Sequence, residues 1–249
     1  MGKLTNKYAV VTGAGKGIGK AIVKRFLEDD VAGVAILEMN FELAEATAKE
    51  LDPTGDKVLA VKCNVASQEE VHAAFEQVFA KFGRVDILVN NAGITRDSMF
   101  HKMPVDMAKL VMDVHFYGTF YCCQEVIPGM RDRAYGKIVN ISSVSALGNV
   151  GQCNYAAAKA AIEGFTRTLA LESARKNITV NAIAPGMIDT DILSTIPEDI
   201  MKQRIASSPA QRLGDPSEIA SVASFLASDD SSWLTGNTLI VSGGVKLKP

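Results

Sequence analysis

The feature that most constrains this 249-residue chain is a regular alternation of short apolar segments with longer stretches of helical periodicity. Apolar residues recur every three or four positions in the longer stretches, as in Gln68–Phe82. The short segments have the composition of strands that are covered on both faces: Tyr8–Thr12, Val34–Leu37, Val58–Val61, Val85–Val89, Lys137–Ile141, Ile178–Ile183 and Thr238–Val241. This alternation predicts an α/β fold with a doubly wound parallel sheet of seven strands between two layers of helices.

The chain contains no low-complexity linker and no internal repeat, so we expect residues 1–249 to form a single domain. Its longest stretch without an expected strand runs from Ala184 to Asn237, where prolines break the pattern into short helices and turns. This stretch follows the end of a strand, which is where parallel sheets bind ligands. We therefore expect a substrate lid over about residues 187–213, in preference to a simple elaboration of the fold.

Charge and composition exclude several classes of protein. Lys and Arg number 26 and Asp and Glu number 28, and the resulting net charge of −2 gives no electrostatic case for nucleic acid or an anionic membrane. No apolar run reaches the roughly 18 residues of a membrane span, and the first strand is expected too early for a signal peptide. Without a C-x-x-C pair or a histidine cluster, we expect reduced thiols, no metal site and a cytoplasmic protein.

A glycine-rich loop joins the first expected strand to a helix expected over Lys20–Glu28. Gly13, Gly17 and Gly19 allow a tight turn and a close approach of the backbone to a pyrophosphate, and the helix start offers free N–H groups. The glycine spacing is wider than in the G-x-G-x-x-G fingerprint, and such a loop can also be a plain turn. Its position between a strand and a helix favours a nucleotide site.

Two charged residues bear on the choice of dinucleotide. Glu38 closes the second expected strand, where a carboxylate accepts hydrogen bonds from the adenosine ribose and repels a 2′-phosphate. Lys16 in the loop is the opposing signal, because it could meet a 2′-phosphate or could simply be a solvated lysine. A phosphate usually needs a second cation, but Met39 and Asn40 follow Glu38. The residues favour NAD, and NADP is the alternative.

Candidate chemistry lies near the fifth strand and the helix that follows it. Tyr155 and Lys159 are four residues apart, so they share one face of that helix. An ammonium beside a phenol stabilises the phenolate, and we expect Lys159 to lower the pKa of Tyr155 toward the range of a general acid–base catalyst. The fifth strand ends in Ser142 and Ser143, where a hydroxyl can bind a substrate oxygen facing the same tyrosine.

Taken together, these motifs resemble those of the short-chain dehydrogenase/reductase family. The resemblance covers almost the whole chain and rests on motifs in the expected order: Thr12–Gly19, Asn90–Gly93, Ser143, Tyr155-x-x-x-Lys159 and Pro185-Gly186. Within the family, three runs are most similar to the 3-oxoacyl-[acyl-carrier-protein] reductases: Asn91–Asp97, Gly148–Lys159 and Asn64-Val65. The resemblance implies a Rossmann fold and a homotetramer.

The resemblance also implies a role for each motif. Tyr155 would be the general acid that protonates a ketone, Lys159 would bind the nicotinamide ribose, and Ser143 would hold the substrate carbonyl, while hydride passes from the nicotinamide. The implied cofactor contacts are Gly13, Lys16, Gly17, Ile18 and Gly19 at the pyrophosphate, Glu38 at the ribose, Asn64 and Val65 at the adenine, Asn91, Ala92 and Gly93 toward the nicotinamide, and Pro185, Gly186, Ile188 and Thr190 near the carboxamide.

Two positions depart from the family pattern. His115 stands where the family usually has an asparagine that completes a proton relay to the lysine; an imidazole could maintain the relay, or it could be packed at a helix kink. The spacing from Ser143 to Tyr155 is one residue shorter than the common one, so counting back from Tyr155 selects Ser142. Strand alternation selects Ser143, which we prefer.

The substrate is expected to be a small molecule or a thioester. One of two basic positions thought to dock acyl carrier protein falls at Ala134 and the other at Lys176, with Arg131 and Arg133 nearby, which leaves a carrier-bound substrate open. We expect an NAD(P)-dependent enzyme that interconverts a secondary alcohol and a ketone, first of all a 3-oxoacyl thioester. The alternatives are an NAD-linked dehydrogenase of a hydroxysteroid, a sugar or another secondary alcohol, which Glu38 favours, and a catalytically silent dinucleotide sensor.

Overall fold

The computed structural model describes residues 2–191 and 198–245, and its strands form one seven-stranded sheet. The strands are β1 (Tyr8–Thr12), β2 (Gly33–Glu38), β3 (Val58–Lys62), β4 (Ile87–Asn90), β5 (Gly136–Ile141), β6 (Ile178–Pro185) and β7 (Thr238–Val241). Every neighbouring pair is parallel, in the order β3-β2-β1-β4-β5-β6-β7. The expected doubly wound sheet is confirmed.

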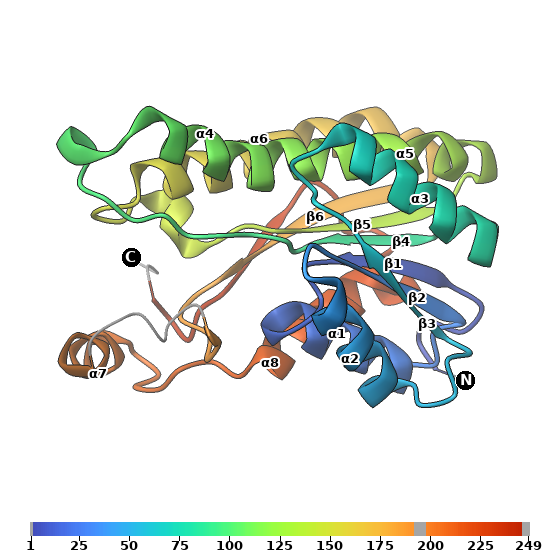
Figure 1. Ribbon diagram of the computed structural model, residues 1–249, viewed down its shortest axis with the longest axis horizontal. Coiled ribbons are helices and arrows are strands. Elements are labelled where there is room, and N and C mark those ends of the chain that lie inside the picture. Colours follow the sequence, from blue (N-terminus) through green and yellow to red (C-terminus); the bar gives the residue numbers. More distant parts are fainter. Residues whose placement is uncertain (1, 192–197, 246–249) are drawn as a thin grey trace.

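Helices cover both faces of this sheet (Figure 1). The α-helices are α1 (Gly17–Glu28), α2 (Phe41–Leu51), α3 (Gln68–Phe82), α4 (Val105–Met112), α5 (Gly118–Arg133), α6 (Cys153–Ser173), α7 (Glu198–Ser207) and α8 (Pro216–Ala227). One layer contains α1, α2 and α8, and the opposite layer contains α3, α4, α5 and α6 (Figure 1). The three-layer arrangement is as expected from the sequence.

Several boundaries differ from those expected, and three of them differ by two residues or more. β4 begins at Ile87 rather than Val85, because Val85 is buried just before the strand and a buried residue there is indistinguishable from a strand residue by its hydrophobicity. α1 begins at Gly17 rather than Lys20, since glycines in its first turn interrupt the apolar period. β6 extends to Pro185, two residues beyond the expected end.

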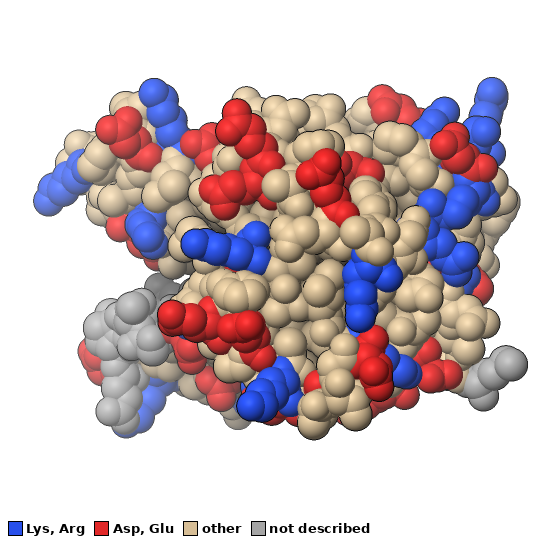
Figure 2. Space-filling model, turned by 45° about the vertical axis from the view of Figure 1, so that its right-hand side comes forward, with Lys and Arg blue, Asp and Glu red and all other residues tan. Residues whose placement is uncertain are grey.

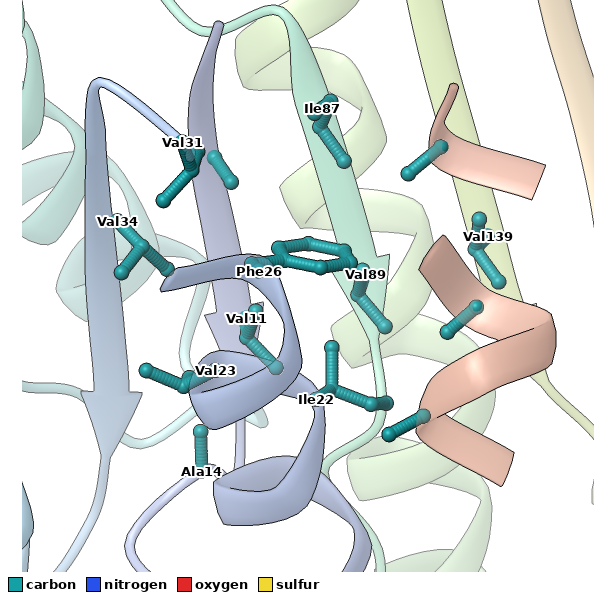
Figure 3. Packing of buried hydrophobic residues seen from close by; sticks show 14 of the residues in the cluster. Val11, Ala14, Ile22, Val23, Phe26, Val31, Val34, Ile87, Val89 and Val139 are labelled. Carbon is teal, nitrogen blue, oxygen red and sulfur yellow. The ribbon is translucent and has the colours of Figure 1, made fainter. Parts of the chain in front are cut away.

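The core between α1 and the sheet is made of large side chains without polar atoms. Phe26 of α1 is fully buried and points toward Val11 of β1 and Val89 of β4, with Ile22 one turn earlier on the same helix (Figure 3). Burying a side chain of this size contributes about 1.5–3 kcal/mol relative to leaving it exposed. This packing fixes α1 against β1 and β4.

The connection between β3 and β4 determines where a ligand can bind. β3 lies at one edge of the sheet, and the chain then crosses to place β4 on the other side of β1. Connections from β1 and β4 consequently leave in opposite directions, which opens a crevice outside the carboxyl ends of these strands. The glycine-rich loop follows β1 and the Asn91–Gly93 segment follows β4, so both expected motifs border this crevice.

The expected lid over 187–213 is described except for residues 192–197. Its described part includes a short parallel bridge between Ile188 and Gly214 and the helix α7. The face shown in Figure 2 mixes acidic and basic side chains, in keeping with the small net charge.

Within the described ranges, no helix is both long and apolar enough to cross a membrane. No group of three or more His, Cys, Asp or Glu residues in these same ranges is arranged to hold a metal ion. All four cysteines are free, with Cys63, Cys122 and Cys123 buried and Cys153 exposed.

Candidate active site

Hydrogen bonds join the loops that follow β1 and β4. The Thr12 hydroxyl oxygen accepts hydrogen bonds from the backbone N–H groups of Asn91 and Ala92, each at 3.0 Å. The Asn91 side-chain amide donates to the carbonyl oxygens of Thr12 and Gly13, each at 2.9 Å. The sequence suggested Asn91 as a cofactor contact, but its amide is occupied in holding the two loops together.

The glycine-rich loop has the shape that a bound pyrophosphate requires. Gly13 and Gly17 have φ values of +61° and +56°, which residues with a side chain rarely adopt. A Cβ on Gly13 would lie 2.7 Å from the Ala92 Cα, and one on Gly19 would lie 2.5 Å from the Gly13 carbonyl oxygen. Lys16 precedes α1, and no side chain in the described part of the chain caps the helix there. The first amides of α1 are thus available to an anion.

Glu38 lies beside this loop at the end of β2. Its carboxylate accepts hydrogen bonds from the backbone N–H groups of Gly15 and Asn40, both at 3.3 Å. The carboxylate therefore lies one loop residue away from the start of α1, on the side where β2 ends. A ribose next to the pyrophosphate would meet this negative charge first.

The segment after β6 reaches the glycine-rich loop from the other side. Lys16 Nζ forms an ion pair with Asp191 at 2.9 Å, and the Thr190 methyl group would lie 3.4 Å from a Cβ on Gly17. Ile188 is buried against Gly214, close to the start of α8. Of the residues expected near the carboxamide, Thr190 is the one that the structure brings against the loop. Nothing in the sequence pattern pointed to Asp191 as a partner of Lys16.

Two further groups of expected cofactor contacts lie at strand ends but direct their atoms into the fold. Val65 follows β3 and packs on Gly118 of α5, whose added Cβ would lie 2.9 Å from a Val65 methyl carbon. Asn64 uses its side-chain oxygen to accept the backbone N–H of Ala66 at 3.1 Å. Gly186 follows Pro185 and lies against Ser242, with no room for a side chain. Backbone atoms are what these segments can offer to a ligand.

The catalytic candidates converge between the end of β5 and the start of α6. The Ser143 hydroxyl lies close enough to the Tyr155 side chain for hydrogen bonding to lower the pKa of the tyrosine. Ser142 is buried instead, and its hydroxyl donates to the Glu163 carboxylate at 2.9 Å. Lys159 is also buried, with Nζ 5.5 Å from the centre of the Tyr155 ring and donating to the Ile141 carbonyl oxygen at 2.6 Å. The structure thus places Ser143, and not Ser142, at the tyrosine.

The charge balance at this site differs from the expectation that Lys159 lowers the pKa of Tyr155. Burial raises the pKa of Tyr155 to about 12, helped by repulsion from Asp97 and opposed by the hydrogen bond with Ser143. Burial also lowers the pKa of Lys159 to about 7. The expectation was wrong for the protein without ligand, because removing both groups from water disfavours phenolate and ammonium alike. Tyr155 is a protonated phenol at neutral pH.

His115 lies beside the same tyrosine, in the π-helical turn Asp113–Tyr117 between α4 and α5. Its ring meets that of Tyr155 edge-on, with 5.2 Å between centres, and a Cβ on Gly93 would lie 2.4 Å from its Cε1 atom. Nε2 lies 3.1 Å from the Ile94 nitrogen and 2.8 Å from the Ile94 oxygen, so either neutral tautomer bonds this backbone.

Burial, with repulsion from Lys159, lowers the pKa of His115 to about 3. The imidazole is therefore neutral at physiological pH. Its Nδ1 atom is buried without a hydrogen-bond partner among the described residues. These contacts agree with the second alternative from the sequence, a histidine packed at a distortion of the helix. The ring lies between Tyr155 and the loop after β4.

A network that the sequence did not reveal fixes the approach to Tyr155. The Gln152 side-chain amide donates to the Asp97 carboxylate at 2.9 Å, and the Asn154 side-chain amide donates to the Arg96 carbonyl oxygen at 2.8 Å. These bonds join the loop after β4 to the residues that precede Tyr155. In the sequence, these residues belong to two separate polar runs. Only the fold shows that the two runs are neighbours.

Comparison with known proteins gives consistent matches over almost the full length. The family model described as enoyl-(acyl carrier protein) reductase matches residues 13–246. The 3-oxoacyl-[acyl-carrier-protein] reductase FabG of Staphylococcus epidermidis is 40% identical over 241 residues, which are 96% of this chain and 99% of the relative. The proteins of the same name from Vibrio cholerae and Chlamydia muridarum are 42% and 43% identical, over 97% of this chain and 98% of each relative.

The buried histidine predicts a loss of stability in acid. The pKa of His115 is about 3 in the folded chain and about 6.5 in an unfolded one, so between these values the unfolded state binds more protons. The stability that depends on neutral His115 is therefore fully present above pH 6.5 and is lost as the pH falls below it. The free energy of unfolding, measured by urea titration, should decrease between pH 7 and pH 4.5. We expect this decrease to be about 2 kcal/mol smaller in His115→Asn than in the wild type. The exposed His101→Asn should keep the wild-type loss; equal losses in all three proteins would contradict the assignment.

Proposed function

The chain belongs to the short-chain dehydrogenase/reductase family, and on that basis we propose that it reduces the ketone of a 3-oxoacyl thioester to the 3-hydroxyacyl thioester. As a family member it is an NAD(P)-dependent oxidoreductase that acts on CH–OH and keto groups. The substrate proposal is supported by three relatives that are named for 3-oxoacyl reduction and are at least 40% identical over nearly the whole chain.

The observation that carries the proposal is the contact between the Ser143 and Tyr155 hydroxyls beside Lys159. The pair lies at the carboxyl end of β5, on the same edge of the sheet as the glycine-rich loop. Two hydroxyls in contact can bind one carbonyl oxygen together, which fixes the position of the ketone carbon. Lys159 brings the charge that stabilises phenolate as the proton leaves Tyr155.

The residues at the crevice fit a nicotinamide dinucleotide. The start of α1 is open to the pyrophosphate, Gly13 and Gly17 provide the turn, and Glu38 is placed for the adenosine ribose. When bound, the dinucleotide supplies the hydride. We propose NAD as the cofactor, because Glu38 would repel a 2′-phosphate, and Lys16 already pairs with Asp191.

The chain's own residues manage the proton. With its pKa near 12, Tyr155 is protonated at neutral pH and is ready to donate to the carbonyl oxygen. Ser143 holds that oxygen and donates a second hydrogen bond as negative charge develops on it. His115 keeps the Tyr155 ring in place. Tyr155 thus enters the reduction in the protonation state that proton donation requires.

A second candidate function is the oxidation of another secondary alcohol, such as a hydroxysteroid or a sugar. Glu38 favours it, because an NAD-linked enzyme often works in the oxidative direction. The raised pKa of Tyr155 opposes it, since the phenol must then act as a base.

Assembly and location complete the proposal. We propose a homotetramer that uses the outer surface of α5 and α6, where Tyr117 stacks on Tyr121 with 6.0 Å between ring centres and Phe120 packs against Phe165. Tyr117 is 44% exposed, which makes it available to a second copy. We propose the cytoplasm as the location, in keeping with four unpaired cysteines.

Replacement of the proposed acid tests the reaction. Tyr155→Phe keeps the ring that packs on His115 but removes the hydroxyl, so we expect acetoacetyl-CoA reduction to fall by about 10²–10⁴-fold. Cofactor affinity, measured by nucleotide fluorescence, should change by less than about twofold, because the ring remains. Tyr121→Phe on α5 is the matched control. A Tyr155→Phe enzyme with more than a tenth of the wild-type rate would rule out this role.

The lowered pKa of Lys159 predicts the pH dependence of reduction. Its ammonium is present below about pH 7 and is lost as the pH rises, whereas Tyr155 stays protonated over the same range. We therefore expect kcat/KM for reduction to fall above pH 7 to a lower plateau. Lys159→Arg keeps its charge throughout, so its slower reaction should be flat from pH 6 to 9. A flat wild-type profile would contradict the assignment.

The cofactor proposal is tested by comparing NADH with NADPH. The wild type should prefer NADH by at least about fivefold in kcat/KM, because one like-charge contact costs on the order of 1 kcal/mol or more. Glu38→Gln should reduce that preference, while Glu42→Gln, in the exposed first turn of α2, should not. Lys16→Ala separates the two signals: a loss confined to NADPH would show that Lys16 meets the 2′-phosphate, and a wild-type preference for NADPH would overturn the proposal.

A further inference from the structure

Four large apolar side chains are more than half exposed on the two loops that border the catalytic hydroxyls. The loop after β4 carries Met99 and Phe100, which are 51% and 76% exposed. The loop after β5 carries Leu147 and Val150, which are 63% and 84% exposed. We call these four residues the apolar rim. Apolar side chains left in water in such a group mark a binding surface.

Backbone and side-chain hydrogen bonds hold the two halves of the rim together. The Ser98 N–H donates to the Gly151 carbonyl oxygen at 2.8 Å. Met99 follows Ser98 and Val150 precedes Gly151, so each is one residue away from the same hydrogen bond. The bond between Gln152 and Asp97 closes the junction on its other side. These bonds therefore hold the two loops side by side, with Met99 and Val150 next to their junction.

The apolar rim lies next to the candidate catalytic hydroxyls. Ser143, which touches Tyr155, is also the cap of the 3-10 turn Val144–Leu147, and its hydroxyl oxygen accepts the Ser145 N–H at 3.1 Å. Leu147 is thus one short turn beyond Ser143, or about 8 Å along the turn axis. In Figure 1, the loops that follow β4 and β5 lie together at the end of the molecule where α4 and α6 approach each other.

We propose that the apolar rim binds the alkyl chain of the substrate, so that the enzyme prefers medium-length 3-oxoacyl thioesters over acetoacetyl thioesters. This inference rests on the proposed function. A carbonyl held by Ser143 and Tyr155 leaves the carbons beyond it free to extend along Leu147 and Val150 toward Phe100. Each methylene fully removed from water raises affinity by about fourfold, and one that is half covered by an open surface raises it by about twofold.

The test compares 3-oxobutanoyl-CoA with 3-oxodecanoyl-CoA, below the concentration at which the longer thioester forms micelles. The longer substrate has six more carbons, so we expect its kcat/KM to be at least about tenfold higher in the wild type. Val150→Ser and Phe100→Ser should each reduce this ratio by at least about threefold. The ratio is taken within each variant, so a loss of active protein that affects both substrates cancels.

Leu171→Ser is the matched control. Leu171 is 82% exposed on α6, but it lies sixteen residues beyond Tyr155, about 24 Å along the helix. Both rates should remain at the wild-type level in this variant. A ratio near one in the wild type, or a ratio that Val150→Ser and Phe100→Ser leave unchanged, would overturn the inference while acetoacetyl turnover still supported the proposed reaction. Failure to reduce either thioester would instead contradict the proposed function.

Discussion

The hydrogen bonds that join the end of β1 to the end of β4 are the constraint on which the rest of the site depends. The strands are neighbours, yet their connections leave toward opposite edges of the sheet, so nothing in the topology keeps the two loops together. Thr12 and Asn91 supply that link with four hydrogen bonds. The glycine-rich loop and the Gly93–Ile94 segment, which packs on His115, both follow directly from this junction.

Removal of water, more than attraction between charges, sets the protonation of the candidate catalytic groups. Tyr155, Lys159 and His115 are each shifted toward the neutral form, with burial as the largest cause. A site in this condition holds a neutral phenol and no preformed phenolate, which is the state that the proposed proton donation needs. The Lys159 ammonium is the charge that would stabilise a Tyr155 phenolate, and burial lowers the pKa of this same ammonium. The protonation of Tyr155 and Lys159 is therefore sensitive to small changes around Lys159.

Much of the fold could be predicted from the sequence because its strands are apolar on both faces and its helices on one. The seven parallel strands followed from that pattern, and the glycine-rich loop followed from its place between a strand and a helix. The first turn of α1 was missed because its glycines carry no apolar period. Strand alternation was sufficient to direct Ser143 toward Tyr155, since successive side chains of an extended segment point to opposite sides.

The electrostatics and the long-range partners could not be predicted in the same way. The pKa of Tyr155 depends on how completely the fold excludes water, and a spacing of four residues to Lys159 contains no such information. The pairing of Lys16 with Asp191 joins residues 175 positions apart. The resemblance implied Asn91 as a cofactor contact, and only the fold shows that its side-chain amide donates to the carbonyl oxygens of Thr12 and Gly13.

The π-helical turn Asp113–Tyr117 has a consequence for both sides of the helix that contains it. A wider turn holds one extra residue, and each residue added to a helix rotates everything after it by about 100°. The packing of His115 against Gly93 and the position of Tyr121 on α5, where it stacks on Tyr117, thus depend on the same insertion. Deleting a single residue from this turn would restore a regular helix and, in one step, misalign the ring that packs on Tyr155 and the surface proposed for a second subunit.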